Sequence, residues 1–279
     1  MISLPIPNRT VTEAVRLCTG NIENQDLVHR LIATEQHLST SEKNYKALAG
    51  NSLLFTLAAT DSVVNTVTRD EMKWIYKNKF SKLGHPCRKI YNEIKSKTST
   101  CPLCNSRVTS TLDHYLPQSV FAEFIVTPSN LIPSCSDCNK IKLSRISERK
   151  TDQTLHPYFD TIPTDEPWIT AEIIEDSPTG VIFEAKPPDH WDPDLKKRLE
   201  SHFTTFNLQE LYSTKAASEL AQIIRYTREE FLIFGSEGLR SYLVRQAISR
   251  YQADPHSWQP ALYLGLSESD WFVNGNAFS

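Results

Sequence analysis

The sequence contains no long apolar run, no internal repeat and no low-complexity tract, and its first residues do not have the composition of a signal peptide. None of its 279 residues belong to a run of about 18 consecutive apolar residues, the length that a membrane-spanning helix needs. The first ten residues, MISLPIPNRT, lack the basic part and the long apolar part of a signal peptide. We therefore expect a cytoplasmic protein with no membrane partner, long enough for one large or two moderate domains.

An overall excess of positive charge is also absent. The formal net charge is -3 at pH 7, which argues against a protein that coats nucleic acid generally. The charge is nevertheless uneven, because residues 69–150 contain 15 Lys and Arg against seven Asp and Glu, whereas residues 165–200 contain four against ten. A charged run is usually a solvated face, but the basic run coincides with the motif described next, as a surface that contacts phosphates requires.

Cysteine is sparse, and most of the cysteines occur in C-x-x-C motifs. Four of the six cysteines form two C-x-x-C pairs, Cys101 with Cys104 and Cys135 with Cys138. Two such pairs can complete the tetrahedral S₄ shell of a structural Zn²⁺, which leaves the ion no open position for a substrate. We expect this zinc to stabilise the fold. The other two cysteines, Cys18 and Cys87, are predicted to be reduced and structural, since cytoplasmic thiols seldom form disulfides.

Polar residues that suit hydrolytic chemistry lie between and beside the two pairs. They are Asp113, His114, Asn130 and Asn139. A neutral imidazole that titrates near pH 7 suits a general base, and carboxylate and amide oxygens suit a hard cation such as Mg²⁺. Asp113 and His114 are adjacent, so in a strand they point to opposite sides. Both can serve one site only if the backbone bends, and the nearby Pro117 is consistent with a bend.

In order and spacing these residues resemble the HNH, or ββα-metal, nuclease family, specifically its zinc-stapled branch. The resemblance covers residues 101–144, about a sixth of the chain. It implies that Asp113 and Asn139 ligate a catalytic Mg²⁺ or Mn²⁺ and that His114 is the general base. It also implies that Asn130 pins the intervening loop by hydrogen bonds. Asn139 stands where the family name has a histidine, and HNN variants occur in the family.

The resemblance implies an α+β fold, with a zinc-stapled ββα-metal core inside a mainly α-helical scaffold. The implied activity is hydrolysis of DNA phosphodiester bonds with 5′-phosphate ends, in restriction or anti-phage defence, under the control of an ATPase encoded nearby. Two other interpretations are open. One is a non-catalytic zinc-stapled module that binds DNA or protein. In the other, the flanking helices are a docking platform for the ATPase and the nuclease is its effector arm.

Basic side chains near the motif are the expected contacts to DNA phosphates, which position a duplex without reading its sequence. These side chains are Lys73, Lys77, Lys140, Lys142 and Arg145. Lys142 lies about one helical turn from Asn139 and therefore on the same face. It is expected either to reach a phosphate oxygen beside the metal or to be an ordinary surface lysine.

Three regions are predicted: helical residues 1–98 with basic helices, the nuclease core at residues 99–160, and residues 161–279 with a β-hairpin followed by helices. Capping boxes at Thr10 and Thr68, each followed three residues later by Glu, begin two helices. Further predicted helices cover residues 24–38, 41–60, 87–97, 136–149, 207–234 and 236–251, and predicted strands cover 107–115, 169–175 and 181–185. One more helix begins at Asp192. We do not expect His156 at the metal.

Overall fold

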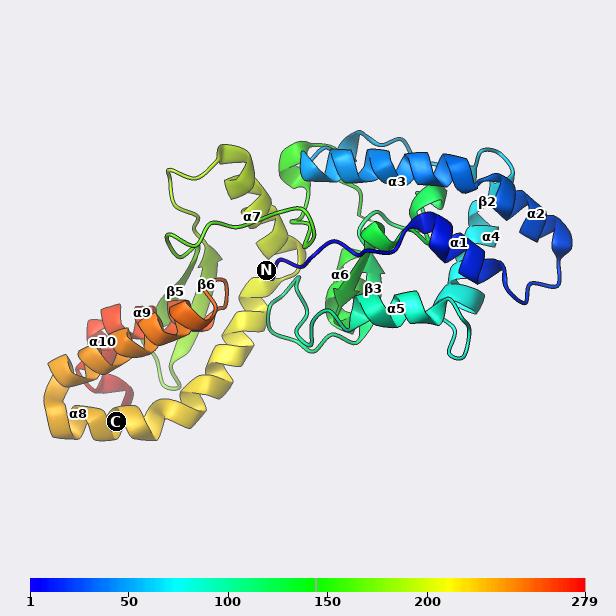
Figure 1. Ribbon diagram of the computed structural model, residues 1–279. Coiled ribbons are helices and arrows are strands. Elements are labelled where there is room, and N and C mark those ends of the chain that lie inside the picture. Colours follow the sequence, from blue (N-terminus) through cyan, green and yellow to red (C-terminus); the bar gives the residue numbers. More distant parts are fainter. Residues whose placement is uncertain (144, 279) are drawn as a thin grey trace. The chain divides into compact units, whose positions relative to one another are not determined.

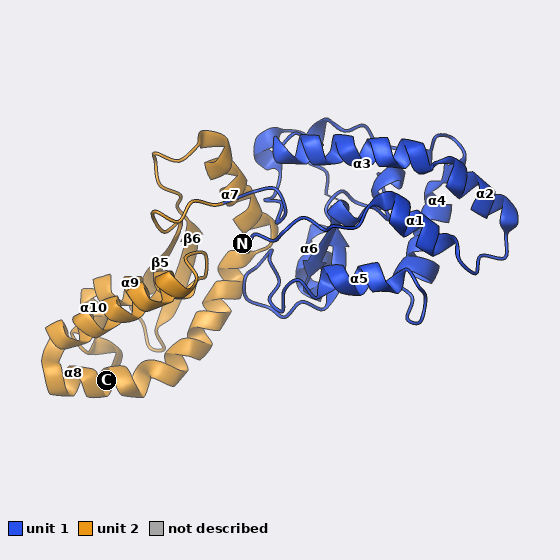
Figure 2. Cartoon of the chain, in the orientation of Figure 1, with its two compact units in different colours: residues 1–161 blue, residues 162–279 orange. Residues whose placement is uncertain are grey.

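The structure, a computed structural model, describes residues 1–143 and 145–278. The chain divides into two compact units, residues 1–161 and 162–279 (Figure 2). It is mainly helical, and within the described ranges the strands form three two-stranded antiparallel sheets. The second unit begins one residue after the predicted start of the C-terminal region. No helix in this part of the chain has both the length and the apolar composition that crossing a membrane requires.

Short sequence signals define the first helices of unit 1. Both predicted capping boxes are confirmed, with Thr10 accepting a hydrogen bond from the Glu13 amide and Thr68 accepting one from the Glu71 amide. The helices of this region are α1 (Val11–Thr19), α2 (Gln25–Ala33), α3 (Glu35–Gly50), α4 (Arg69–Ile75) and α5 (Arg88–Lys95). A π-helical turn at Tyr76–Phe80 continues α4. The short pair β1 (Ser62–Val63) and β2 (Val67–Thr68) precedes α4.

The predicted boundary between the second and third helices was wrong. The periodicity placed the break near residues 38–41, whereas α2 ends at Ala33 and Thr34 separates it from α3. There the Thr34 hydroxyl donates a hydrogen bond of 2.7 Å to the Leu31 carbonyl, which competes with continuation of the helix. Apolar spacing continues through this position because both helices bury one face, so periodicity alone did not reveal the break.

Two strands and a helix follow one another in the motif region. Strand β3 (Thr111–His114) pairs with β4 (Leu131–Ser134), and α6 (Ser136–Lys142) follows (Figure 1). The sequence did not predict β4, because Pro133 lies inside it opposite Leu112 and proline is disfavoured in strands. In a two-stranded sheet each strand has a free edge, where a proline is tolerated. The predicted helix 136–149 was too long: α6 ends at Lys142, Leu143 has a φ of 49°, and Ser144 lies outside the described residues.

The predicted boundary at residue 98 does not separate two compact units. One hydrophobic cluster joins Val15 of α1 and Met72 of α4 to Ile90 of α5, Leu112 of β3 and Leu131 of β4, all of them almost completely buried. Each such side chain contributes about 1.5–3 kcal/mol of burial free energy. Helices α5 and α6 also contact β3 directly. The N-terminal helices are therefore part of the body that positions the motif residues.

Unit 2 consists of a β-hairpin and helices, as predicted. Strands β5 (Ile169–Ile174) and β6 (Gly180–Ala185) pair in antiparallel fashion. Asp192 caps α7 (Pro193–Thr205) by accepting a 2.9 Å hydrogen bond from the Leu195 amide. The long α8 (Leu208–Ala253) reverses at Gly235, whose φ of 68° favours glycine, and the Tyr226 and Tyr242 rings pack 5.0 Å apart across the two arms. The short helices α9 (Gln259–Glu268) and α10 (Asp270–Val273) complete the unit.

Candidate metal centre and active site

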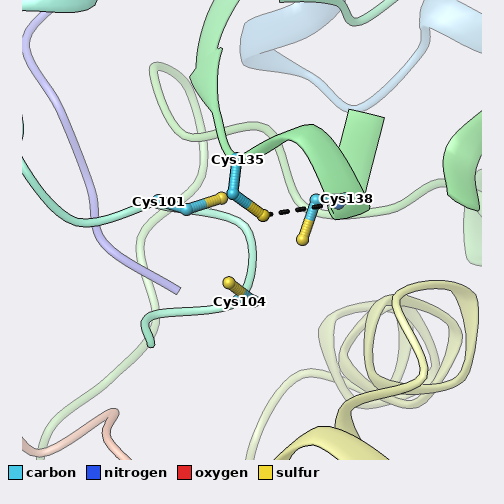
Figure 3. Close-up of side chains that lie close together, drawn as sticks. All are labelled: Cys101, Cys104, Cys135 and Cys138. Atoms are coloured by element: carbon cyan, nitrogen blue, oxygen red, sulfur yellow. Dashed lines mark hydrogen bonds between the residues drawn. The ribbon is translucent and has the colours of Figure 1, made fainter. Parts of the chain in front are cut away.

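The four cysteines of the two C-x-x-C pairs form one buried cluster (Figure 3). All their sulfur atoms lie within 4.8 Å of one another, and an ideal tetrahedral Zn–S₄ site with Zn–S bonds of about 2.3 Å has sulfurs about 3.8 Å apart. Cys135 also caps α6, its Sγ accepting a 3.3 Å hydrogen bond from the Cys138 amide. A hydrogen bond from the Cys104 thiol lowers the pKa of Cys101. The cluster can hold a zinc ion, which agrees with the predicted spacing.

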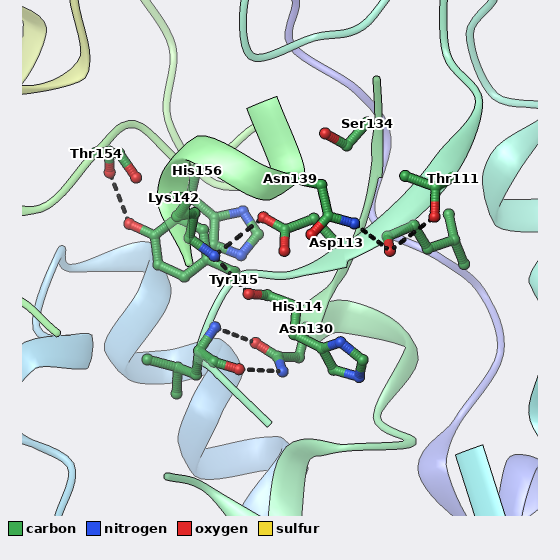
Figure 4. A network of polar contacts seen from close by, with 12 residues as sticks. Thr111, Asp113, His114, Tyr115, Asn130, Ser134, Asn139, Lys142, Thr154 and His156 are labelled. Carbon is green, nitrogen blue, oxygen red and sulfur yellow. Dashed lines mark hydrogen bonds and ion pairs between the residues drawn. The ribbon is translucent and has the colours of Figure 1, made fainter. Parts of the chain in front are cut away.

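Unit 1 has a pocket that is lined by residues of the sequence motif. Its volume is about 770 Å³, and Asp113, His114 and Asn139 all line it. The two adjacent residues leave β3 on opposite sides, with Asp113 directed towards α6 and His114 away from it (Figure 4). Strand β3 ends at His114, and Pro117 also lines the pocket. The three residues that the sequence proposed as one site therefore all line one pocket, although the side chains of Asp113 and His114 leave β3 on opposite sides.

Asp113 forms a buried ion pair with Lys142. The Lys142 Nζ lies 3.1 Å from Oδ2 of Asp113 and also donates a hydrogen bond to the His114 carbonyl. Burial raises the pKa of Asp113, and the nearby ammonium group opposes this shift. Lys142 is therefore neither a surface lysine nor placed for the expected phosphate contact. Its position along α6 is one turn beyond Asn139, as predicted, but its ammonium group is bound to the carboxylate.

Asn139 presents an amide oxygen beside this carboxylate. Its Nδ2 donates a 3.3 Å hydrogen bond to the Leu112 carbonyl on β3, which orients the amide. Among the described residues, Oδ1 of Asn139 has no hydrogen-bond donor. Asp113 and Asn139 are adjacent in the polar network of Figure 4 and line the same pocket. A carboxylate and an amide oxygen are the ligand types that Mg²⁺ and Mn²⁺ prefer, so this pair fits a hard cation.

His114 is held in one tautomer. Its Nε2 lies 2.8 Å from the Ile125 carbonyl oxygen, and a carbonyl can only accept, so Nε2 carries the proton and Nδ1 has the lone pair. The Tyr76 ring packs at 4.6 Å against the imidazole. Burial lowers the pKa of His114 to about 4. The imidazole is therefore neutral at pH 7, and Nδ1 is its basic atom.

Asn130 does not line the pocket but fixes the loop behind it. Its Oδ1 accepts hydrogen bonds from the Leu116 amide (2.7 Å) and the Tyr45 hydroxyl (3.1 Å). Its Nδ2 donates to the carbonyls of Leu116 and Phe124, both at 3.1 Å. Phe124 directly precedes Ile125, whose carbonyl orients His114. Asn130 thus forms hydrogen bonds within the loop, of the kind that the resemblance implied, next to the residue whose carbonyl contacts His114.

Only some of the residues predicted to contact DNA line the pocket. Lys73 and Lys140 line the pocket, whereas the exposed Lys77 and Arg145 do not. The prediction missed Arg88, which also lines the pocket from α5. The basic helix that carries Arg88 was visible in the sequence, but nothing in the sequence indicated which of its cations faces the site.

His156 is not among the residues that line the pocket. Its Nε2 is 3.0 Å from the Tyr45 hydroxyl, and its ring packs 4.2 Å from the Tyr115 ring. It belongs to the buried network behind Asn130. Tyr45 lies within the predicted helix 41–60, and no local signal indicated that its hydroxyl would contact the loop.

The fold and the site define a mainly helical α+β protein with a cysteine cluster able to hold zinc. The chain is similar to protein ea31 of Escherichia phage lambda, with 27% identity over 300 residues that cover 99% of this chain and 100% of that protein. No family model matches the sequence. No solved structure matches it either.

Removing the Lys142 cation tests the buried pair directly. Lys142→Met is expected to reduce the free energy of unfolding at neutral pH by about 3 kcal/mol, because Asp113 is left buried and unpaired. The pKa of Asp113 is already raised in the folded protein and should rise further. The native state then binds more protons than the unfolded state, so the deficit should shrink as the pH falls. Denaturant unfolding at neutral and acidic pH measures both effects.

Lys140→Met is the matched control, since Lys140 is exposed on the same helix. It should change the free energy of unfolding by less than about 0.5 kcal/mol. The double variant Lys142→Met with Asp113→Asn should recover most of the lost stability, because no buried charge remains. Equal stabilities of Lys142→Met and Lys140→Met would contradict the assignment of the ion pair.

Proposed function

We propose that the protein is a metal-dependent endonuclease of the HNH type that hydrolyses DNA phosphodiester bonds. The observation that carries this proposal is the meeting of Asp113, His114 and Asn139 at one pocket, with the imidazole neutral and a single ring nitrogen available as a base. Two oxygen ligands and a base around one cavity are the groups that hydrolysis of a phosphodiester needs.

Each residue has a defined role in this reaction. Asp113 and Asn139 would hold Mg²⁺ or Mn²⁺, which when bound neutralises charge on the phosphoryl group and the leaving 3′ oxygen. Nδ1 of His114 accepts a proton from the attacking water, while Nε2 keeps its proton on the Ile125 carbonyl. Water attack with departure of the 3′ oxygen leaves 5′-phosphate and 3′-hydroxyl ends. Asn130 positions the imidazole, and the cysteine-bound zinc stabilises the fold around it.

Support for DNA as the substrate comes from the cations. Lys73 and Lys140 line the pocket, and all the residues that line it belong to the basic segment 69–150. Cations around a metal-dependent hydrolytic site suit a polyanionic substrate. Restriction or anti-phage defence with an ATPase partner follows from the motif resemblance alone.

A plasmid assay separates this proposal from a zinc-stapled binding module. Purified protein with Mg²⁺ or Mn²⁺ should convert supercoiled plasmid to nicked and linear forms, and Asp113→Asn or added EDTA should stop the conversion. A binding module would shift the plasmid in a gel without cutting it, and Asp113→Asn would leave that shift unchanged. Co-purification with an ATPase from the native host tests the docking-platform interpretation.

The pH profile of cleavage should report the environment of His114. The base must be deprotonated, and burial lowers the pKa of His114 to about 4. The rate should therefore stay constant from pH 8 to about pH 5 and fall about tenfold per pH unit only below about pH 4. A solvated histidine would lose activity already below about pH 6.5. Initial rates of plasmid nicking across this range distinguish the two, and a decline centred near 6.5 would contradict the buried-base assignment.

A further inference from the structure

We propose that Arg88 is the phosphate-binding residue of this pocket. The inference rests on the proposed function for the identity of the ligand, a nucleic-acid phosphodiester. Arg88 opens α5 and lines the pocket together with Asp113 and His114. Its guanidinium stacks on Tyr91, which also lines the pocket, whereas Asn139 and Lys140 line the same pocket from α6. Helix α5 thus supplies a guanidinium, and α6 an amide oxygen, to one pocket.

The guanidinium of Arg88 is held in place before any ligand binds. Its Nε donates a 2.9 Å hydrogen bond to Oδ1 of Asn92, and its Nη1 donates to the Ser81 carbonyl. Its Cζ stacks 3.8 Å from the centre of the Tyr91 ring. The side-chain entropy lost on binding is therefore small, because the rotamer is already selected. Nη2 has no hydrogen-bond acceptor within the part of the chain that the structure describes.

The charge of Arg88 is not neutralised by a carboxylate among the described residues. Both of its acceptors are neutral, one amide oxygen and one carbonyl. Two nearby lysines differ in this respect, because Lys142 is paired with Asp113 at 3.1 Å and Lys73 with Asp70 at 3.5 Å. Lys140 differs in another way, since its side chain is exposed on α6 and is not stacked on an aromatic ring among the described residues. A fixed and unneutralised guanidinium is the group best suited to bind a phosphate.

A purely structural role for Arg88 makes a different prediction. If Arg88 only ties Ser81 to α5, its removal should lower the thermal midpoint without changing the number of phosphates contacted. Binding of a nucleic acid releases counterions, so the slope of log affinity against log salt counts those contacts for each variant. The salt slope should therefore change only if Arg88 contacts a phosphate, and not if its role is purely structural.

The experiment measures binding without cleavage. A short fluorescein-labelled DNA duplex is titrated with full-length protein in EDTA, by anisotropy, over a series of salt concentrations. Arg88→Ala should bind about 10-fold or more weakly, as expected for loss of a charged hydrogen bond, and its salt slope should fall by about 0.9. Arg88→Lys should keep the slope and lose part of the affinity. Lys89→Ala, which removes an exposed charge from the same helix, should bind within about twofold of wild type.

Asn92→Ala keeps the charge but releases the guanidinium. It should weaken binding with an unchanged slope and an intact fold, so the inference remains testable even if Arg88→Ala does not fold. Equal affinities of Arg88→Ala and Lys89→Ala, or a wild type that binds no duplex, would overturn the inference. If binding depends on Arg88 but the wild type never cuts in Mg²⁺ or Mn²⁺, the nuclease proposal fails and the phosphate site stands.

Discussion

His114→Ala should reduce the rate of plasmid cleavage by about 10²–10⁴-fold, the usual contribution of a positioned general base. The loss should fall on the cleavage rate, because His114 is buried against Ile125 and Tyr76 and contributes no charge at neutral pH. Affinity for duplex DNA in EDTA should therefore remain within about twofold of wild type. Single-turnover cleavage and anisotropy measure the two quantities separately.

His29→Ala is the matched control for this prediction, since His29 is exposed on α2 and away from the pocket. It should cut at the wild-type rate. Circular dichroism must show that His114→Ala remains folded, because the substitution leaves a small cavity beside Tyr76. The end chemistry is a second check, as the cut ends of wild type should be ligatable without added kinase. Undiminished cutting by a folded His114→Ala would remove the proposed base.

Cys138→Ser should abolish stoichiometric zinc binding and destabilise unit 1 by about 5 kcal/mol or more. Structural zinc supplies about 10 kcal/mol or more to small zinc-dependent folds, and here other hydrophobic contacts retain part of the structure. For a unit of this size the midpoint of thermal unfolding should fall by at least about 10 °C. Cys138 lies inside α6, beside Asn139, so the loss of zinc should also stop cleavage. Elemental analysis and thermal unfolding measure the outcome.

Cys18→Ala provides the control for the zinc prediction. Cys18 is equally buried but packs in the hydrophobic cluster near Cys87, outside the four-cysteine cluster. Its removal should lower stability by a cavity contribution of about 1 kcal/mol and leave one zinc per chain. Full zinc content in Cys138→Ser, or none in Cys18→Ala, would contradict the assignment of ligands.

Several features of this protein were determined locally and could be predicted from the sequence. The capping residues Thr10, Thr68 and Asp192 mark helix starts because the groups that satisfy each other are three residues apart. The reversal at Gly235 follows from a backbone conformation that glycine favours. The four-cysteine cluster followed from spacing, because each pair fits one tight turn. Asp113, His114 and Asn139 were selected by their order relative to these cysteines.

Other features depend on contacts between segments far apart in the chain. β4 contains Pro133 and forms only because β3 lies beside it. Lys142 is a buried partner of Asp113 because α6 packs on β3, whereas its local pattern indicated either a phosphate contact or a surface lysine. The hydroxyl of Tyr45 reaches Asn130, 85 residues away. Arg88 lines the pocket and its exposed neighbour Lys89 does not, because the pocket lies on one side of α5.

The sequence by itself therefore determined the capped helix starts, the four-cysteine cluster and the chemical types of the candidate site. The tertiary structure decided which cations are neutralised, which tautomer His114 adopts and which residues line the pocket. The physical reason is distance: a cap or a C-x-x-C turn is complete within a few residues. The charge state and orientation of a buried group depend on all the segments packed around it.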